Sequence, residues 1–490
     1  MGNEIFELKH IFGLKIKEIR QEKGITYQEL KEQTGMSVSY LSEIENGKKY
    51  PKADKIMLLS DALEVPYDEL VSLKVPKKLQ PIIGLIQSDF FKAFPLLEFG
   101  LNPQKLVEIV SQDPVKVNAF INTILQISKN FELKQEQFYY AALRSYQELQ
   151  NNYFGDLEQS AYNLNLEFPE LIDVPFTEKT LTEILLQIGV RVSFEGLAEE
   201  ELLKDIRSLY KSKERLLLIN GGLNSGQKNF LLAREIAFQW LKLKKRPLST
   251  PPIGSFDFEE ILNNHKASYF AAALMMPEGR FVKDLKAFVS SAEWNADKFI
   301  ALSSSYDVTP EMLLQRLTNI LPTHFGVKNL FFLRFLGEEQ GKNFTLTKEL
   351  HLSGQHNPHG NGLSEHYCRR WISIESINEV FRAKEKPELL VRTQISRYHG
   401  NTNSDMCISI AFPNISNGDE VISVTLGFLM TDEHKKRLPF LNDKQITTRE
   451  VNKTCERCNI MNCRERAALP SVYDQAQQKE QLEALISKMS

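Results

Sequence analysis

Residues 26–47 read TYQELKEQTGMSVSYLSEIENG and predict two short amphipathic helices joined by a tight turn. Thr26, followed three residues later by Glu29, forms a capping box that starts the first helix. Gly35 can take the positive φ that the turn requires, and Ser37 is the N-cap of the second helix. The apolar residues of the second helix repeat at helical spacing and are expected to face inward. They are Val38, Leu41 and Ile44.

The flanking sequence predicts helices that support this pair. Residues 14–20 form a helix before it, Pro51 opens a helix after it at the favoured early position, and Pro66 starts a short closing helix. Their apolar positions include Ile16, Ile19, Ile56, Leu59 and Leu63. The composite pattern resembles the XRE class (phage-repressor-like) of helix-turn-helix domains, over about sixty residues. This resemblance implies that the second helix enters the major groove of DNA, whereas a helical bundle that binds no DNA is the alternative.

The predicted DNA-contacting residues lie on the outer face of the two helices or are nearby cations. They are Arg20, Gln28, Ser37, Ser39, Tyr40, Glu43, Asn46, Lys48 and Lys49. The first 80 residues contain 13 Lys plus Arg and 13 Asp plus Glu, so attraction to phosphates depends on where the cations lie. Because two half-sites add their contacts, we expect a homodimer on a (pseudo)palindromic double-stranded DNA operator.

The composition of the whole chain is that of a large intracellular protein. At 490 residues it should hold three or four domains. Five cysteines in so long a chain favour a reducing cytoplasm over a disulfide framework. No uninterrupted apolar run approaches the ~18 residues of a membrane span, and no apolar signal segment opens the chain. We therefore expect a cytoplasmic protein that does not bind a membrane.

The segment from about residue 176 to 318 combines a short apolar strand at 216–220, a long helix at 229–241 and the run FAAALMMP at 270–277. This order resembles the IrrE/ImmA family of regulatory metallopeptidases, over about 140 residues. Members of that family carry a His-Glu-x-x-His zinc helix and a third, carboxylate ligand just before a Phe-Ala-Ala-x-Leu-Leu-Met-Pro segment.

The family's zinc ligands are missing from the matching positions of this sequence. Arg234 and Phe238 stand where the two histidines should be, and Lys266 falls about where the third ligand should be. Charged arginine and lysine have no lone pair to donate, and phenylalanine has no donor atom. Glu235 keeps the position of the general base, but His265 alone cannot supply a three-ligand site. The sequence therefore predicts a degenerate pseudo-peptidase domain and no enzyme activity.

The segment from about residue 323 to 470 predicts a sheet with a few helices. Strands are expected at 329–336 and 343–348 as a hairpin, and further strands at 407–412 and 420–429. A helix is expected at 374–384. This texture indicates an α+β sensor-like domain.

Three cysteines lie within nine residues near the end of this segment, at Cys455, Cys458 and Cys463. Cys-x2-Cys is a metal-ligand spacing, and Cys368 could supply a fourth thiolate. Zinc and an iron–sulfur cluster are both open as the metal group. Reduced thiols beside an arginine-rich loop are the alternative.

The hairpin, the Cys-x-x-Trp segment from Cys368 and the closing segment from Cys455 to Ala467 look like the C-terminal domain of the short-chain fatty-acyl-CoA-responsive regulators. In that family an XRE helix-turn-helix precedes a zinc-less IrrE-like region, so the domain order also matches. The resemblance implies that an acyl-CoA effector controls genes of carbon and fatty-acid metabolism. Candidates for contacting the CoA phosphates are Arg392, Arg397, Tyr398, Arg464 and Arg466. A solvated surface is the alternative role for each of them.

The sequence as a whole predicts a multidomain fold and a transcriptional regulator. Alternatives are a redox or metal sensor that uses the C-terminal cysteines, and a repressor-cleaving protease, which the missing zinc ligands disfavour. The predicted mechanism is a shift between two arrangements, in which the effector changes the separation of the two recognition helices. The predicted domains are an all-α helix-turn-helix domain (1–75), a helical spacer or dimerisation region (76–170), an α+β degenerate zincin-like domain (171–320), an α+β C-terminal sensor domain (321–470) and a helical tail (471–490).

Overall fold

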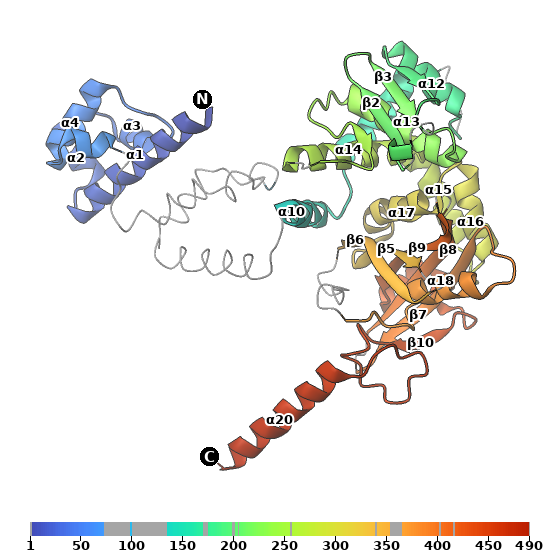
Figure 1. The fold of residues 1–490 in the computed structure, drawn as a ribbon. Coiled ribbons are helices and arrows are strands. Elements are labelled where there is room, and N and C mark those ends of the chain that lie inside the picture. Colours follow the sequence, from blue (N-terminus) through green and yellow to red (C-terminus); the bar gives the residue numbers. More distant parts are fainter. Residues whose placement is uncertain are drawn as a thin grey trace. The chain divides into compact units, whose positions relative to one another are not determined.

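The computed structural model of the protein describes residues 2–72, 99, 135–169, 175–197, 201–203, 205–254, 257–338, 341–352, 365–400, 403–414 and 417–489. The chain forms two compact units, Met1–Tyr146 and Gln147–Ser490 (Figure 1). The linker predicted at 75–78 and the part of the predicted spacer up to residue 134 lie outside the described residues, apart from residue 99. Among the described helices, none combines the length and the hydropathy that crossing a lipid bilayer requires.

Five helices form the described N-terminal part of the first unit. They are α1 (Gly2–Glu22), α2 (Tyr27–Thr34), α3 (Val38–Glu45), α4 (Ala53–Leu63) and α5 (Tyr67–Val71). Each helix contributes a nearly fully buried apolar side chain to one core, and burial of such a side chain stabilises the fold by about 1.5–3 kcal/mol. The five side chains are Ile16, Leu30, Leu41, Leu59 and Leu70.

Two details of this unit differ from the sequence prediction. Val38 is 38% exposed instead of facing inward. It is the first residue of α3, one turn before the part of that helix that packs on the core. Pro51 does not open α4, because that helix begins at Ala53 with Lys52 as its N-cap, and Pro51 lies buried just before it.

The second unit begins with helices and a small sheet. Helix α10 (Gln135–Leu149) crosses the boundary between the units. The next elements are α11 (Gly155–Glu167), α12 (Glu178–Gln187), β1 (Arg191–Ser193), the 3-10 helix η2 (Glu201–Leu203), β2 (Ser208–Lys211), β3 (Leu216–Ile219) and, later in the chain, β4 (Ser249–Thr250). The strand order is β1-β3-β2-β4, in which β1 and β3 are parallel and the other pairs are antiparallel.

Long helices pack beside this sheet. Helices α13 (Ser225–Trp240) and α14 (Phe258–Met275) each start at a capping box, built by Asn224 with Gln227 and by Asp257 with Glu260. The helices α15 (Glu278–Val289), α16 (Ala296–Ser305) and α17 (Pro310–Phe325) follow. The strand predicted at 216–220 and the helix predicted at 229–241 are confirmed as β3 and α13.

The last part of the second unit is built on a six-stranded sheet. The strands are β5 (Leu330–Glu338), β6 (Asn343–His351), β7 (Leu390–Tyr398), β8 (Ser404–Asn414), β9 (Asn417–Leu429) and β10 (Thr448–Val451). Their order is β10-β7-β8-β9-β5-β6, and only β10 and β7 run parallel. The predicted hairpin is β5 with β6, and the two further predicted strands lie within β8 and β9.

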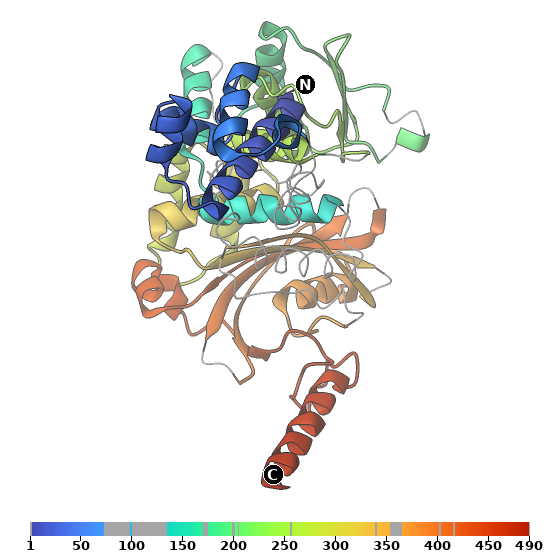
Figure 2. The same ribbon diagram turned by 90° about the vertical axis from the view of Figure 1, so that its left-hand side faces the viewer.

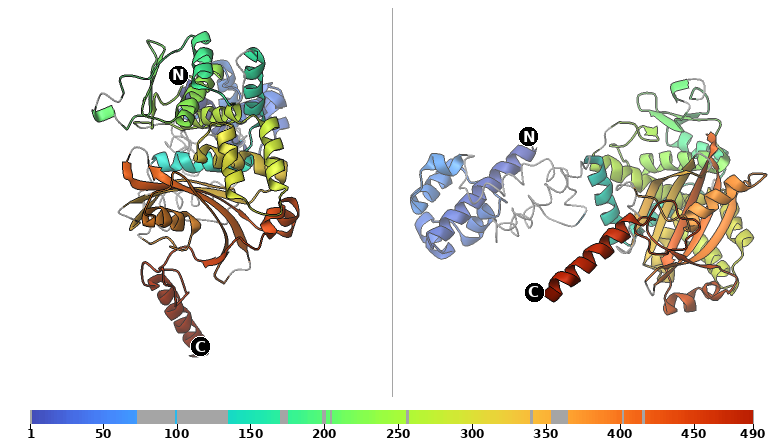
Figure 3. Two further views of the ribbon diagram at one scale, coloured as in Figure 1. Left: turned by 90° about the vertical axis from the view of Figure 1, so that its right-hand side faces the viewer. Right: turned by 60° about the horizontal axis from the view of Figure 1, so that its bottom comes forward.

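Helix α18 (Ile372–Arg382), which confirms the helix predicted at 374–384, covers one face of this sheet. Helix α17 contacts β5 and β9 on the other face (Figures 2 and 3). Two strand glycines make room for the side chains between α18 and the sheet. A Cβ at Gly337 would lie 2.4 Å from Ile377 Cγ2, and a Cβ at Gly427 would lie 2.1 Å from Phe331 Cζ.

Two short helices and one long helix complete the described chain. Helix α19 (Asp432–Arg437) and the 3-10 helix η4 (Pro439–Asn442) follow β9, and α20 (Ser471–Met489) ends the described residues. None of the described residues of α20 is buried, and the helix extends away from the sheet (Figure 1).

Candidate functional site

The turn between α2 and α3 is set by three local features. Thr26 Oγ1 accepts a hydrogen bond from Glu29 N at 3.2 Å, and Thr26 N donates to Glu29 Oε2 at 2.7 Å. Gly35 ends α2 in the left-handed region with φ 66°. Ser37 Oγ accepts a hydrogen bond from Tyr40 N at 3.2 Å and so fixes the first turn of α3. The predicted capping box, turn glycine and N-cap are therefore confirmed.

A buried ion pair behind α3 joins it to α1 and α2. Arg20 Nε and Nη2 donate to the two carboxylate oxygens of Glu45 at 2.6 and 3.0 Å, and Tyr27 Oη donates to Glu45 Oε2 at 2.6 Å. Burial and this hydrogen bond raise the pKa of Tyr27 to about 12, so its hydroxyl stays a donor at neutral pH. Arg20 is among the predicted phosphate contacts. Because Glu45 holds its guanidinium inside the unit, we remove Arg20 from the proposed DNA-binding surface.

The other predicted DNA-contacting residues lie at the surface of α2, α3 and the loop after α3. Lys49 Nζ is 2.7 Å from Glu43 Oε2 and 5.5 Å from the ring centroid of Tyr40, so a cation lies beside the side chains of α3. The exposed members of the set are Gln28, Ser37, Ser39, Lys48 and Lys49, and the partly exposed members are Tyr40, Glu43 and Asn46. Val38 adds an apolar group to the same surface, which its helical spacing did not reveal.

This surface has the layout with which a helix-turn-helix reads DNA. A recognition helix presents the side chains of its N-terminal turns to base edges in the major groove, while cations near it contact phosphates. Here the exposed hydroxyls of Ser37 and Ser39 and the phenol of Tyr40 lie at that end of α3. The geometry defines a helix-turn-helix DNA-binding domain.

In the second unit, α13 carries the residues that match the metallopeptidase zinc motif. The carboxylate of Glu235 accepts hydrogen bonds from Arg246 Nη1 at 2.9 Å, from Arg246 Nη2 at 2.5 Å and from Gln239 Nε2 at 2.7 Å. The Arg246 guanidinium lies 3.9 Å from the ring centroid of Phe238. Arg246 therefore contacts both Glu235, at the general-base position, and Phe238, at the second histidine position. Its charge neutralises the Glu235 carboxylate.

The residue at the first histidine position, Arg234, is also buried. Its Nη2 donates to Thr250 Oγ1 on the edge strand β4. Burial and the charge of Arg246 lower the pKa of Arg234 to about 10, so it stays protonated at neutral pH. Nearby His265 is half-buried with its Nε2 atom enclosed, and its pKa is lowered to about 4, mainly by this burial and then by Lys348 and Lys266. The side chains at the motif positions thus present positive charge and leave one neutral imidazole near Lys266.

Further cations lie near these residues. Glu311, at the start of α17, is contacted by Arg334 Nε at 3.3 Å and by Lys348 Nζ at 3.2 Å, from β5 and β6. The charge of Arg207, which precedes β2, acts on both Glu311 and Arg234. The group that we call the basic cluster therefore has five cations against two carboxylates. It consists of Arg207, Arg234, Arg246, Arg334 and Lys348, with Glu235 and Glu311.

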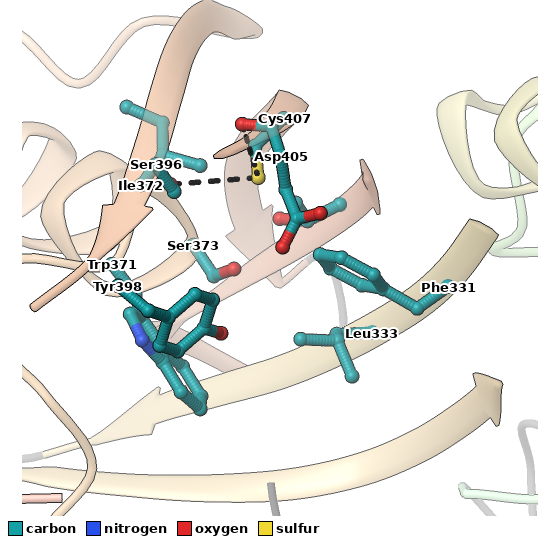
Figure 4. A pocket seen from close by; sticks show the side chains of 10 residues that line it. Phe331, Leu333, Trp371, Ile372, Ser373, Ser396, Tyr398, Asp405 and Cys407 are labelled. Atoms are coloured by element: carbon teal, nitrogen blue, oxygen red, sulfur yellow. Dashed lines mark hydrogen bonds between the residues drawn. The ribbon is translucent and has the colours of Figure 1, made fainter. Parts of the chain in front are cut away.

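A small pocket lies between the start of α18 and the sheet (Figure 4). Its walls include Phe331 of β5, Trp371 before α18 and Tyr398 of β7, and Asp405 of β8 points into it. The cavity measures about 20 Å³, which holds one or two water-sized groups. Burial raises the pKa of Asp405 to about 6 and that of Cys407 to about 12.

The C-terminal cysteines lie in a loop that Arg466 organises. Arg466 donates to the backbone oxygens of Cys455 at 2.9 Å, Cys458 at 3.1 Å and Ile460 at 2.8 Å. The pKa of Cys368 is raised to about 11, mainly by burial, and Cys455 and Cys458 add to this rise. In the part of the chain that the structure describes, no three His, Cys, Asp or Glu side chains are arranged to hold a metal ion. The metal role of the four cysteines stays a prediction.

The five residues predicted to contact an effector do not gather in one place. Arg392 pairs with Glu379 at the surface, Arg397 and Arg464 are exposed, and Arg466 binds the cysteine loop. Only Tyr398 lines the pocket. The basic cluster was not predicted from the sequence, although Arg234 and Lys266, at the positions of zinc ligands, were a signal of positive charge there.

Comparisons with known proteins fit this division of the chain. Residues 16–70 match the sequence profile described as "Helix-turn-helix", and residues 185–318 match the profile described as "IrrE N-terminal-like domain". A solved structure described as a "Mycobacterium tuberculosis transcriptional regulator" is similar with 17% identity and a TM-score of 0.47, over 67% of this chain and 93% of that chain. No curated protein matches the chain. The chain thus combines a domain similar to helix-turn-helix domains with one similar to the IrrE N-terminal domain.

Proposed function

We propose that the protein is a transcriptional regulator that binds its operator as a homodimer, through the outer face of α3. The observation that carries this proposal is the exposed N-terminal surface of α3, braced from behind by the Arg20–Glu45 ion pair, in a segment that matches helix-turn-helix domains. Because the domain has no excess of positive charge, binding depends on base contacts and on pairing of two half-sites more than on phosphate attraction.

The test uses fluorescence anisotropy on a duplex selected from chromosomal fragments. Replacing Ser39 and Tyr40 together by alanine should weaken specific binding at least about tenfold, since each good base contact contributes about 1–3 kcal/mol. Asp61→Ala, on the exposed side of α4, is the matched control and should bind as the wild type does. Unchanged affinity of the double variant would show that α3 does not read the operator.

The effector that we propose is a short-chain acyl-CoA, bound with its phosphates at the basic cluster. Five cations gathered around two carboxylates leave an excess of three positive charges in a chain whose overall net charge is −3. Arginine binds phosphate oxygens through two parallel hydrogen bonds. The cluster joins elements of the peptidase-like segment, such as α13, to the hairpin β5–β6, so a ligand there could shift one against the other. In this proposal the basic cluster contacts the CoA phosphates, in place of the arginines that the sequence predicted for that role.

Thermal unfolding with acyl-CoAs, free CoA and the matching free acids tests this effector. A ligand at 100 times its dissociation constant stabilises the folded state by about 2.7 kcal/mol. Arg207→Gln should weaken that stabilisation, whereas Lys328→Gln, also exposed but outside the cluster, should not. If no acyl-CoA stabilises the wild type, the effector proposal fails while the DNA-binding proposal stands.

A second candidate function is metal or redox sensing by the C-terminal cysteines. The bridge between Tyr367 and Thr454 brings Cys368 near Cys455 and Cys458, which a sensor of this kind requires. Metal analysis and the visible spectrum of anaerobically purified protein test it. A stoichiometric metal that is lost in Cys455→Ser would support it, and a metal-free, colourless protein would rule it out.

A further inference from the structure

The pocket of Figure 4 combines aromatic surface with one carboxylate. Three aromatic side chains, Phe331, Trp371 and Tyr398, form much of its wall. The carboxylate of Asp405 points into the space between Phe331 and Ser373. The rest of the wall is apolar or bears hydroxyl groups or the Cys407 thiol, and neither arginine nor lysine lines it.

The Asp405 carboxylate has no counter-charge among the described residues. Neither an ion pair nor a hydrogen bond joins it to another described side chain, and burial is the only cause of its raised pKa. An unpaired carboxylate in an apolar pocket is unfavourable unless it takes up a proton or a cation. The groups that face it, Tyr398 and Cys407, are neutral at pH 7 because burial raises both of their pKa values. Among the described residues, the pocket thus holds the Asp405 carboxylate and no cationic side chain to pair with it.

We propose that this pocket binds the ammonium group of a small alkylamine. The Asp405 carboxylate supplies the counter-charge, and the faces of Phe331 and Tyr398 supply the electron-rich surfaces that attract a cation. The cavity of about 20 Å³ takes the ammonium nitrogen and one adjoining carbon. The hydroxyl oxygens of Ser373 and Ser396 can accept hydrogen bonds from the remaining N–H groups.

This site is separate from the one proposed for acyl-CoA. Phe331 and Leu333 point from β5 towards α18, whereas Arg334 points to the opposite face and contacts Glu311 of α17. The two ligands would therefore lie on opposite faces of the sheet. An acyl chain would fill the aromatic part of this pocket but leave Asp405 unpaired, which favours the amine. The inference goes beyond the proposed function and does not depend on it.

The experiment compares ethylammonium with ethanol, its neutral isostere, on the full-length protein. Saturation-transfer NMR detects binding through the ligand methyl protons, and sodium chloride keeps the ionic strength constant. We expect ethylammonium to bind at least about tenfold more tightly than ethanol, because only the cation can form the ion pair with Asp405 and the cation–π contacts. Equal binding of the two, or no saturable binding of ethylammonium, would overturn the proposal.

Two variants separate the site from general surface charge. Asp405→Asn should weaken ethylammonium binding at least about tenfold, because it removes the counter-charge and keeps the shape. Asp432→Asn, an exposed acid on α19, should leave it unchanged. Thermal unfolding of Asp405→Asn shows whether the variant is folded, and we expect it to be at least as stable as the wild type. A folded Asp405→Asn variant with wild-type amine affinity would refute the assignment.

Discussion

Glu235→Gln should strongly destabilise the second unit, even though glutamine has the same shape as glutamate. The carboxylate of Glu235 binds both Nη atoms of Arg246, and the two side chains are 3% and 7% exposed. The amide of glutamine would leave the buried guanidinium without a counter-charge and turn an N–H group towards it. Arg246 Nε has no hydrogen-bond partner among the described residues, so the pair with Glu235 carries most of the polar contacts of this guanidinium.

Removing one partner of a buried ion pair costs about 3–5 kcal/mol, because the other charge stays buried and unpaired. A folded unit is stable by about 5–15 kcal/mol in total, so the loss is a large fraction of it. A double variant adds Arg246→Met to Glu235→Gln, and the methionine fills the space beside Phe238 with an apolar side chain. The double variant should therefore recover most of the loss, since a buried pair can be replaced by packed apolar groups at little net change.

Urea unfolding followed by circular dichroism measures the free energy of unfolding of Glu235→Gln, of Arg246→Met and of the double variant. Glu214→Gln is the control, because its pair with Lys211 is exposed with N and O 3.8 Å apart, and we expect a change of at most about 0.5 kcal/mol. If Glu235 were instead the base of an active metallopeptidase, Glu235→Gln would abolish cleavage and leave stability nearly unchanged. That result would refute our account of the Glu235–Arg246 ion pair.

Gly427→Ala should lower the free energy of unfolding by about 1–3 kcal/mol through overpacking, since the new Cβ would lie 2.1 Å from Phe331 Cζ; wild-type stability in urea would contradict this. The pKa of Asp405 in the folded state is about 6, above the ~3.9 of an unfolded chain, so the folded state binds the proton more tightly. Stability should therefore fall by about 3 kcal/mol as the pH rises from 4 through 6, at 1.36 kcal/mol per pKa unit, and Asp405→Asn should lack this component; identical pH profiles would refute it. Iodoacetamide should label the partly exposed Cys463 before Cys368, whose pKa is raised to about 11, and mass spectrometry of tryptic peptides would show the opposite order if the loop were open.

Local features of the first unit were predictable because the residues that cause them are neighbours in the sequence. Thr26 with Glu29, Gly35 and Ser37 each act within one helical turn, so their roles could be assigned without knowing the rest of the fold. Arg20 was predicted to contact DNA because its partner in the fold is not a neighbour in the sequence. Its partner Glu45 is 25 residues away, and only the packing of α1 against α3 brings them together.

The same distinction explains what was found in the second unit. The sequence alone shows that Arg234 and Phe238 stand where the metallopeptidase motif has histidines, because that motif has a fixed spacing. The presence of Arg246 beside Glu235 could not be predicted, since it depends on how the chain returns after α13. The amine pocket needs Asp405 to face Phe331, which lies on a strand that is separated from β8 by β9 in the sheet. Among the residues that line this pocket, only Tyr398 was predicted from the sequence as an effector contact.

The central claim, that α3 reads a specific operator as part of a dimer, is tested most directly by selecting bound duplexes from a randomised DNA library with the full-length protein. The account predicts enrichment of one (pseudo)palindromic sequence, with half-sites about one helical turn apart, roughly 10–10.5 base pairs or a multiple of it. It also predicts that the Ser39→Ala, Tyr40→Ala double variant enriches no such sequence. Failure of the wild type to enrich any sequence, at a salt concentration where it remains folded, would contradict the account.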